Sequence, residues 1–222
     1  MGTWLELTAA DGAKVAAYRA DPTGKARGGL VVVQEIFGVN GHIRSVCDGF
    51  AADGYVAVAP ALFDRVERNV DLGYTPDDIA RGRDIRAKAS TDAALADIAA
   101  ARAAVAAAGK VGVVGYCWGG LLAWLAAARL PGWACAICYY GGGMPDAIGE
   151  TPKVPVLAHF GEQDAMIPIA GVEALARAHD SLQVHLYPAG HGFNCDQRGS
   201  FHAESAKLAR ERTLAFLRRH VG

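Results

Sequence analysis

A cysteine, an aspartate and a histidine follow one another along this chain in the order that nucleophilic catalysis can use. The cysteine is Cys117, in the segment Gly115-Tyr-Cys-Trp-Gly119, which follows an apolar run and precedes a helical pattern. In the serine version of this G-x-S-x-G motif, the nucleophile stands on a sharp strand-to-helix turn. The motif predicts that Cys117 is held above a sheet edge, at the positive end of the next helix. Cys117 could also be a small buried hydrophobe, as most unpaired cysteines are.

The candidate acid and base follow the candidate nucleophile. Asp164 ends the segment Phe160-Gly-Glu-Gln-Asp164, directly after an apolar run, where this kind of fold places the third member of a triad. Asp164 could instead cap a turn or a helix, and Glu162 is a nearby competitor. The candidate base is His191, in Ala189-Gly-His-Gly-Phe193. Among the seven histidines, only His191 falls in a glycine-flanked loop after the last expected strand.

Strands and helices alternate in the pattern needed to position such residues. Two strands at 4–8 and 14–19, joined by Asp11-Gly12, predict an antiparallel start. Five later runs are apolar at nearly every position, which is typical of parallel strands covered on both faces, and one more, 182–187, alternates like an edge strand. The five runs are 29–33, 55–59, 110–114, 134–140 and 154–159. Helices are expected at 41–52, 75–88, 91–108, 119–128, 170–178 and 202–220.

Composition favours one folded domain spanning residues 1–222. Hydrophobic residues make up 52% and charged residues 20% of the chain, so a large core can form. The net charge of -1 gives no broad positive field for nucleic acid or a membrane surface. Because no apolar stretch approaches the roughly 20 residues needed to cross a bilayer, we expect a cytoplasmic protein. We expect it to be either a monomer or a small homo-oligomer.

The five cysteines suit a reducing compartment, although Cys135 and Cys138 form a C-x-x-C pair. This pair lies in an apolar run that reads as a buried strand, whereas redox pairs usually sit at an exposed helix start. We favour structural cysteines, with a redox pair as the alternative. No second Cys or His pair has zinc-site spacing, so no metal is expected.

Four segments together resemble the dienelactone hydrolase (carboxymethylenebutenolidase-like) family of α/β-hydrolases. They are Gln34-Glu-Ile-Phe-Gly-Val-Asn40, Gly115-Tyr-Cys-Trp-Gly-Gly120, Gly161-Glu-Gln-Asp164 and Gly190-His-Gly-Phe193. The resemblance covers nearly the whole chain, and the first two segments are the specific ones. It implies an α/β-hydrolase fold with helices on both faces of a mostly parallel sheet. It also implies hydrolysis of a small lactone or ester by Cys117, His191 and Asp164, without a cofactor.

The resemblance also implies a catalytic role for Glu35. In the family, this glutamate contacts the cysteine and helps to switch it to the attacking thiolate. A carboxylate at the end of a buried strand fits that role, although Glu35 could instead cap a helix or form an ion pair. Attack on a carbonyl creates an oxyanion, for which the backbone N–H groups of Trp118 and Ile36 are the expected donors. Water then hydrolyses the acyl-thioester.

Substrate contacts are the least defined part of the sequence prediction. Family members that cleave dienelactone hold its carboxylate with arginines, one of them a few residues after the histidine, where this chain has Cys195. Arg198 is the nearest arginine, and Arg81 is the upstream candidate; both could equally be solvated surface charges. Further candidate contacts are Phe37, Tyr140, Phe193 and the long connection 63–77.

Two alternatives to a dienelactone-type hydrolase are open. One is a broader esterase or thioesterase with the same triad, and the other is a non-catalytic binding protein on the same scaffold.

Overall fold

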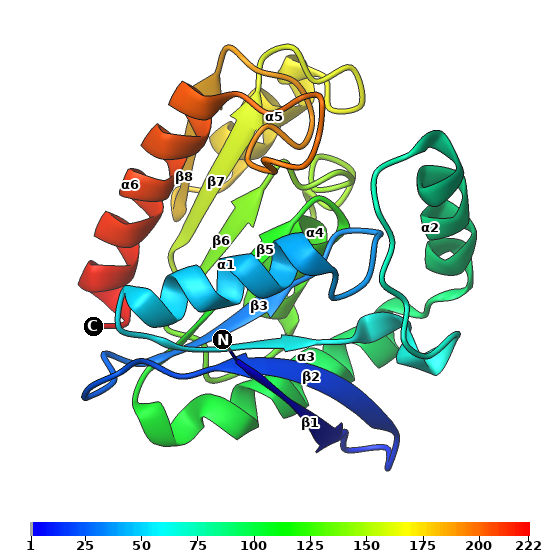
Figure 1. The fold of residues 1–222 in the computed structure, drawn as a ribbon. Coiled ribbons are helices and arrows are strands. Elements are labelled where there is room, and N and C mark those ends of the chain that lie inside the picture. The colour runs from blue at the N-terminus through cyan, green and yellow to red at the C-terminus, as the bar shows by residue number, and fades with distance from the viewer. Residues whose placement is uncertain (1) are drawn as a thin grey trace. The chain divides into compact units, whose positions relative to one another are not determined.

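The computed structural model describes residues 2–222 (Figure 1). The chain divides into two compact units. The first contains the chain up to Val111 together with Val221, and the second contains Gly112–His220 together with Gly222. In the described part of the chain, no helix combines the length and the apolar character that a membrane crossing requires. The expectation that the chain forms one domain stays a prediction.

The first unit is built on four strands in the order β1-β2-β4-β3. Strand β2 pairs antiparallel with both β1 and β4, and β3 pairs parallel with β4. Helices α1 and α3 pack against β3 and β4, with α1 drawn in front of these strands and α3 behind them in Figure 1. The elements of this unit are β1 (Thr3–Thr8), β2 (Lys14–Ala20), β3 (Gly29–Val33), α1 (Gly41–Ala52), β4 (Val56–Pro60), η1 (Leu62–Arg65), α2 (Pro76–Lys88), α3 (Thr91–Val105) and η2 (Ala106–Ala108).

The second unit carries four parallel strands in the order β5-β6-β7-β8, which leaves β8 at an edge, as predicted. Helix α4 packs against β6, and α6 lies along β6 and β7 (Figure 1). Its elements are β5 (Val111–Tyr116), of which only the first residue belongs to the first unit, α4 (Trp118–Arg129), β6 (Cys135–Tyr139), β7 (Val156–Gly161), α5 (Ile169–Ala178), β8 (Leu182–Tyr187) and α6 (Ala203–His220).

Apolar side chains decide which strands lie inside. Every residue of β3, β4, β5, β6 and β7 is buried, because helices cover strands of this kind on both faces. The antiparallel start β1-β2 turns at Gly12, whose φ of 82° suits glycine. The mostly parallel sheet with an antiparallel start confirms the predicted fold class.

Helix ends follow their capping signals. The Thr75 side chain accepts a hydrogen bond from the Asp78 N–H, and the Asp78 side chain accepts one from the Thr75 N–H, so α2 begins with a capping box. Gly109, with φ of 122°, follows η2 and ends the alanine-rich segment, directly after the helix predicted over 91–108. The short helix η1 was not predicted, since no capping pattern precedes it.

Candidate active site

A strained turn carries Cys117 between β5 and α4. The residue has φ of 54° and ψ of -117°, a conformation that side-chain-bearing residues rarely adopt. Its N–H donates to the Tyr139 carbonyl over 3.0 Å, and its carbonyl accepts from the Gly120 N–H over 2.9 Å. A Cβ on Gly115 would lie 1.8 Å from the Gly119 carbonyl oxygen, so glycine is required where strand and helix meet. The predicted strand-turn-helix elbow is therefore present.

Cys117, His191 and Asp164 form a continuous line of polar contacts within the second unit. The Cys117 Sγ lies 3.1 Å from Nε2 of His191, and the opposite ring nitrogen, Nδ1, lies 2.7 Å from Oδ2 of Asp164. An ionised carboxylate only accepts hydrogen bonds, so Nδ1 carries a proton and Nε2 faces the sulfur. The three residues selected from the sequence thus meet in the order sulfur, imidazole, carboxylate, as a triad requires.

The carboxylate of Asp164 is fixed at both oxygens. While Oδ2 contacts His191, Oδ1 accepts the backbone N–H of Met166 over 2.9 Å. The Asp164 side chain is fully buried, and that of His191 is 10% exposed. The sequence prediction missed the Met166 N–H, although an Asp that bonds the N–H two residues on is a known local pattern.

The loops that carry Asp164 and His191 are joined by their backbones. The N–H groups of Glu162 and Gln163 donate to the carbonyls of Tyr187 and Ala189 over 2.8 and 3.0 Å. A Cβ on Gly161 would lie 2.2 Å from the Ala189 carbonyl oxygen, so the close approach of the two loops depends on this glycine. These contacts fix the position of the Asp164 loop relative to the His191 loop.

The site favours the protonated form of His191. Burial by itself lowers the pKa of this imidazole, but the hydrogen bonds and negative charges of Asp164 and Cys117 outweigh it and raise the pKa to about 9. At neutral pH the arrangement therefore favours an imidazolium beside the sulfur. Such a pair is a common way to activate a cysteine nucleophile.

The other four cysteines are buried, whereas Cys117 is partly exposed. Burial raises the pKa of the Cys135 thiol to about 12, and it also raises the pKa of Cys138. Both residues belong to β6, where positions three apart point to opposite faces. A buried pair of this kind supports the structural interpretation of the C-x-x-C motif.

Aromatic side chains pack beside His191. The ring of Tyr140 stands edge-on to the imidazole, with centroids 5.2 Å apart, and Phe193 packs against Tyr140 at 5.5 Å. Tyr140 also has a positive φ of 37°, which is strained for a tyrosine. Both aromatic residues proposed from the sequence in this unit thus lie close to the triad.

Arg198 lies against the backbone next to His191. A Cβ on Gly192 would meet the Arg198 Nη1 at 2.4 Å, and Gly192 has φ of 76°. The arginine approaches the histidine loop although it is seven positions after His191 in sequence. Cys195, which stands near the family's arginine position, is buried.

The remaining predicted residues belong to the first unit. Glu35 is 1% exposed, and the Tyr74 hydroxyl donates to its Oε2 over 3.5 Å. Helix α1 is capped by Asn40, so Glu35 does not cap it. Ile36 follows Glu35 and is partly exposed, and Phe37 is buried with its ring edge-on to Tyr74 at 4.6 Å.

Arginines of the first unit are engaged in local contacts. Arg81 is exposed and forms an ion pair with Glu67. In the connection 63–77, Arg65 pairs with Asp97 over 2.7 Å, and Arg68 donates to the Lys14 carbonyl over 3.0 Å. Local ion pairs and hydrogen bonds within the first unit therefore account for the side chains of Arg65, Arg68 and Arg81.

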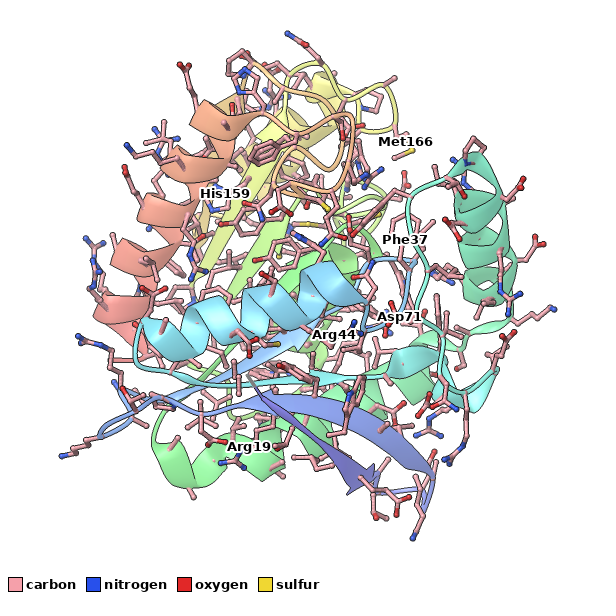
Figure 2. The ribbon with its side chains drawn as sticks, viewed as in Figure 1. Arg19, Phe37, Arg44, Asp71, His159 and Met166 are labelled. Atoms are coloured by element: carbon pink, nitrogen blue, oxygen red, sulfur yellow. The ribbon has the colours of Figure 1, made fainter. Side chains whose placement is uncertain are left out.

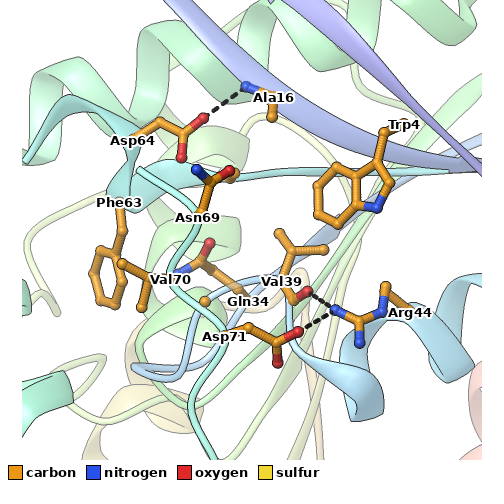
Figure 3. A pocket seen from close by; sticks show the side chains of 12 residues that line it. Trp4, Ala16, Gln34, Val39, Arg44, Phe63, Asp64, Asn69, Val70 and Asp71 are labelled. Atoms are coloured by element: carbon orange, nitrogen blue, oxygen red, sulfur yellow. Dashed lines mark hydrogen bonds and ion pairs between the residues drawn. The ribbon is translucent and has the colours of Figure 1, made fainter. Parts of the chain in front are cut away.

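The connection 63–77 lines a cavity of about 360 Å³ in the first unit (Figure 3). Arg44 holds the connection in place, because its Nη1 contacts Asp71 Oδ2 at 2.8 Å and the Val39 carbonyl at 2.7 Å. Gln34 is a lining residue, but none of the predicted site residues is. The suggestion that this connection faces substrate stays a prediction.

The elbow and the mostly parallel sheet define the chain as an α/β-hydrolase. The family model described as "Dienelactone hydrolase family" matches residues 15–221, and the chain belongs to that family. Membership makes it a hydrolase of small esters or lactones.

Relatives agree with this assignment. The chain is 37% identical over 214 residues to the "Putative carboxymethylenebutenolidase" of Synechocystis sp., covering 87% of each chain. It is 34% identical to the protein of the same name in Escherichia coli K12, covering 87% of this chain and 77% of the relative. The crystal structure of a "Putative Dienelactone Hydrolase" from Klebsiella pneumoniae aligns with a TM-score of 0.85 at 32% identity, covering 97% of this chain and 98% of the other.

Proposed function

We propose that this protein cleaves a small lactone or ester with Cys117 as the nucleophile, His191 as the proton carrier and Asp164 as the group that orients His191. The observation that carries the proposal is the unbroken contact from the Cys117 Sγ to His191 at 3.1 Å and on to Asp164 at 2.7 Å. The raised pKa of His191 supports a protonated imidazole beside the sulfur at neutral pH.

The reaction then runs in two halves. The Cys117 thiolate attacks the carbonyl carbon, a C–S bond forms, and the carbonyl electron pair moves to oxygen. When the oxyanion collapses, the C–O bond of the ester breaks and His191 gives its Nε2 proton to the leaving oxygen. In a lactone this leaving oxygen stays attached to the acyl chain. Water, deprotonated by His191, next attacks the thioester, and the C–S bond breaks to release acid and thiolate.

Backbone N–H groups would stabilise the oxyanion. Trp118 is the first residue of α4, where N–H groups have no acceptor within the helix itself. We propose its N–H as one donor and that of Ile36 as the other, each worth roughly 3 to 4 kcal/mol to the transition state. Glu35 would act on Cys117 as its family counterpart does, keeping the thiol protected until substrate arrives.

A carboxylate-bearing lactone is the proposed substrate class. Its support is Arg198, whose guanidinium lies against Gly192, the residue after the proposed base. Guanidinium groups bind carboxylates through paired hydrogen bonds. Arg81 is the second candidate, and it forms an ion pair with Glu67. Tyr140, Phe193 and Phe37 would supply the apolar walls.

The proposed setting is the cytoplasm, with a small-molecule substrate and no nucleic-acid partner. Five free cysteines suit a reducing compartment, and a net charge of -1 suits neither nucleic acid nor an anionic membrane.

Mass spectrometry of protein quenched during turnover tests the proposal directly. We expect an added acyl mass on the peptide that contains Cys117, both with a neutral aryl ester and with a carboxylate-bearing enol lactone. Cys117→Ala should fold normally, form no adduct and lose ester cleavage. If Cys117→Ala keeps most of the activity, the proposed nucleophile is wrong.

A further inference from the structure

A second polar cluster of the second unit lies between α6 and the strands β7 and β8, and the proposed reaction does not use it. It lines a cavity of about 170 Å³. Leu157 and Phe216 provide an apolar floor, since both are buried. The polar lining comes from Gln183 and His185 of β8 and from Arg212 and Arg219 of α6, and no carboxylate is among the lining residues.

Arg212 is held in place by an aromatic neighbour. Its Nη1 donates to the Tyr187 hydroxyl over 3.1 Å, and its guanidinium lies over the Tyr187 ring, 5.4 Å from the centroid. Because an arginine can only donate, the Tyr187 oxygen accepts this bond and its own proton remains available to another acceptor.

That acceptor is His159, which is fully buried beside α6 (Figure 2). Its Nδ1 lies 2.8 Å from the Tyr187 hydroxyl, and its Nε2 lies 3.1 Å from Oγ1 of Thr213. Burial, followed by the nearby charges of His185 and Arg212, lowers the pKa of His159 well below its usual value, so the ring is neutral. A line of hydrogen bonds from Thr213 through His159 and Tyr187 therefore orients Arg212 before any ligand arrives.

No acidic residue lines the cavity beside its two arginines. Arg212 and Arg219 are seven residues apart, two turns along one face of α6, and neither forms an ion pair with a described acidic group. His185 stacks on the His159 ring at 5.9 Å and makes no hydrogen bond with the described residues. The guanidinium groups of Arg212 and Arg219 and the half-buried imidazole of His185 thus face a cavity that has no acidic lining residue.

We propose that this cavity is a binding site for a small phosphate-bearing anion, separate in its chemistry from ester cleavage. Two guanidinium groups match the charge of a phosphate monoester, which is about -1.5 to -2 at neutral pH. Arginine presents donors in a planar fork that pairs with two phosphate oxygens. Since a water molecule occupies about 30 Å³ in the liquid, a cavity of about 170 Å³ has room for a phosphate and a few attached atoms.

Isothermal titration calorimetry with inorganic phosphate tests this site in the full chain, in a zwitterionic buffer at constant ionic strength. We expect saturable binding of one phosphate per chain and weaker binding of succinate. Arg219→Gln should weaken phosphate binding about tenfold or more, because a charge-assisted hydrogen bond is lost. Arg218→Gln is the matched control. It removes the same charge from the preceding residue of α6, which does not line the cavity, and should change affinity less than about twofold.

Arg212→Lys is the second variant, because it keeps the positive charge but loses the planar fork. Its phosphate binding should also be weaker than that of the unmodified protein, with the fold checked by circular dichroism. The proposal is overturned by any of three results. These are no saturable binding at millimolar phosphate, equal losses in Arg218→Gln and Arg219→Gln, or succinate binding as tightly as phosphate.

Discussion

The carbonyl oxygen of Gly119 lies 1.8 Å from the point that a Cβ on Gly115 would occupy, so the backbone itself closes the elbow beneath Cys117. The contact leaves no space for even a methyl group. It also explains why Cys117 can keep a positive φ, since the residues on both sides of it are held against each other.

Gly115→Ala should therefore damage both stability and activity. Adding a methyl group to a closely packed site typically costs about 1 to 3 kcal/mol of unfolding free energy. Urea unfolding measures that loss, and kcat/KM for an aryl ester measures the displacement of Cys117. Gly142→Ala is the control, because nothing lies within 4 Å of its added Cβ. Equal behaviour of the two variants would contradict the steric argument.

Stability should fall as the pH rises from about 6.5 to about 9. The pKa of His191 is raised from 6.5 to about 9, so the folded protein binds more protons than the unfolded chain in this interval. Protonation thus stabilises the fold fully below pH 6.5, and the effect is lost as pH rises through 9. The loss is at most about 3 to 4 kcal/mol, from a pKa difference of about 2.5.

Unfolding free energies measured across that interval in His191→Gln provide the comparison. The variant lacks the titrating group, so its curve should be flatter than that of the unmodified protein. If the two curves run parallel, His191 is not the group that makes the unfolding free energy depend on pH in this interval.

Iodoacetamide should modify Cys117 before any other cysteine. The reason is that Cys117 is partly exposed and contacts His191, whereas the other four cysteines are buried. Peptide mapping after short exposures measures the order of labelling. His191→Gln should slow the modification of Cys117 without exposing the rest, and initial labelling of Cys135 or Cys138 would argue against the proposed reactivity.

Arg198→Gln should discriminate between substrates. If its guanidinium binds a substrate carboxylate, KM for a carboxylate-bearing lactone should rise about tenfold or more, the effect of losing a charged hydrogen bond. The KM for a neutral aryl ester should stay nearly unchanged. Arg218→Gln controls for net charge. A similar rise for both substrates would indicate that Arg198 supports the histidine loop instead.

Much of the fold and the geometry of the candidate triad could be predicted from the sequence, because their signals are local. Buried strands are marked by apolar runs, α2 by the Thr75 capping box, and the elbow by two glycines around Cys117. Asp164 and His191 could be selected because each follows a strand, and strands of one direction end at one edge of a sheet.

Features made by distant segments could not be predicted in this way. Arg198 approaches Gly192 through a loop without a regular pattern, and Tyr140 adopts a positive φ that its residue type does not favour. Arg212 appears from the sequence as one of several charges on α6, and only its packing on Tyr187 distinguishes it.

The backbone hydrogen bonds between the loops of Asp164 and His191 also bear on how such an enzyme can evolve. An insertion in either loop would break these hydrogen bonds and move Asp164 away from His191. New substrate specificities therefore cannot easily arise from changes in these two loops. Segments that take no part in these hydrogen bonds, such as 196–201, can change in sequence and length without separating Asp164 from His191. Lineages that share this core would be expected to diversify their substrates at the periphery while leaving the two joined loops at constant length.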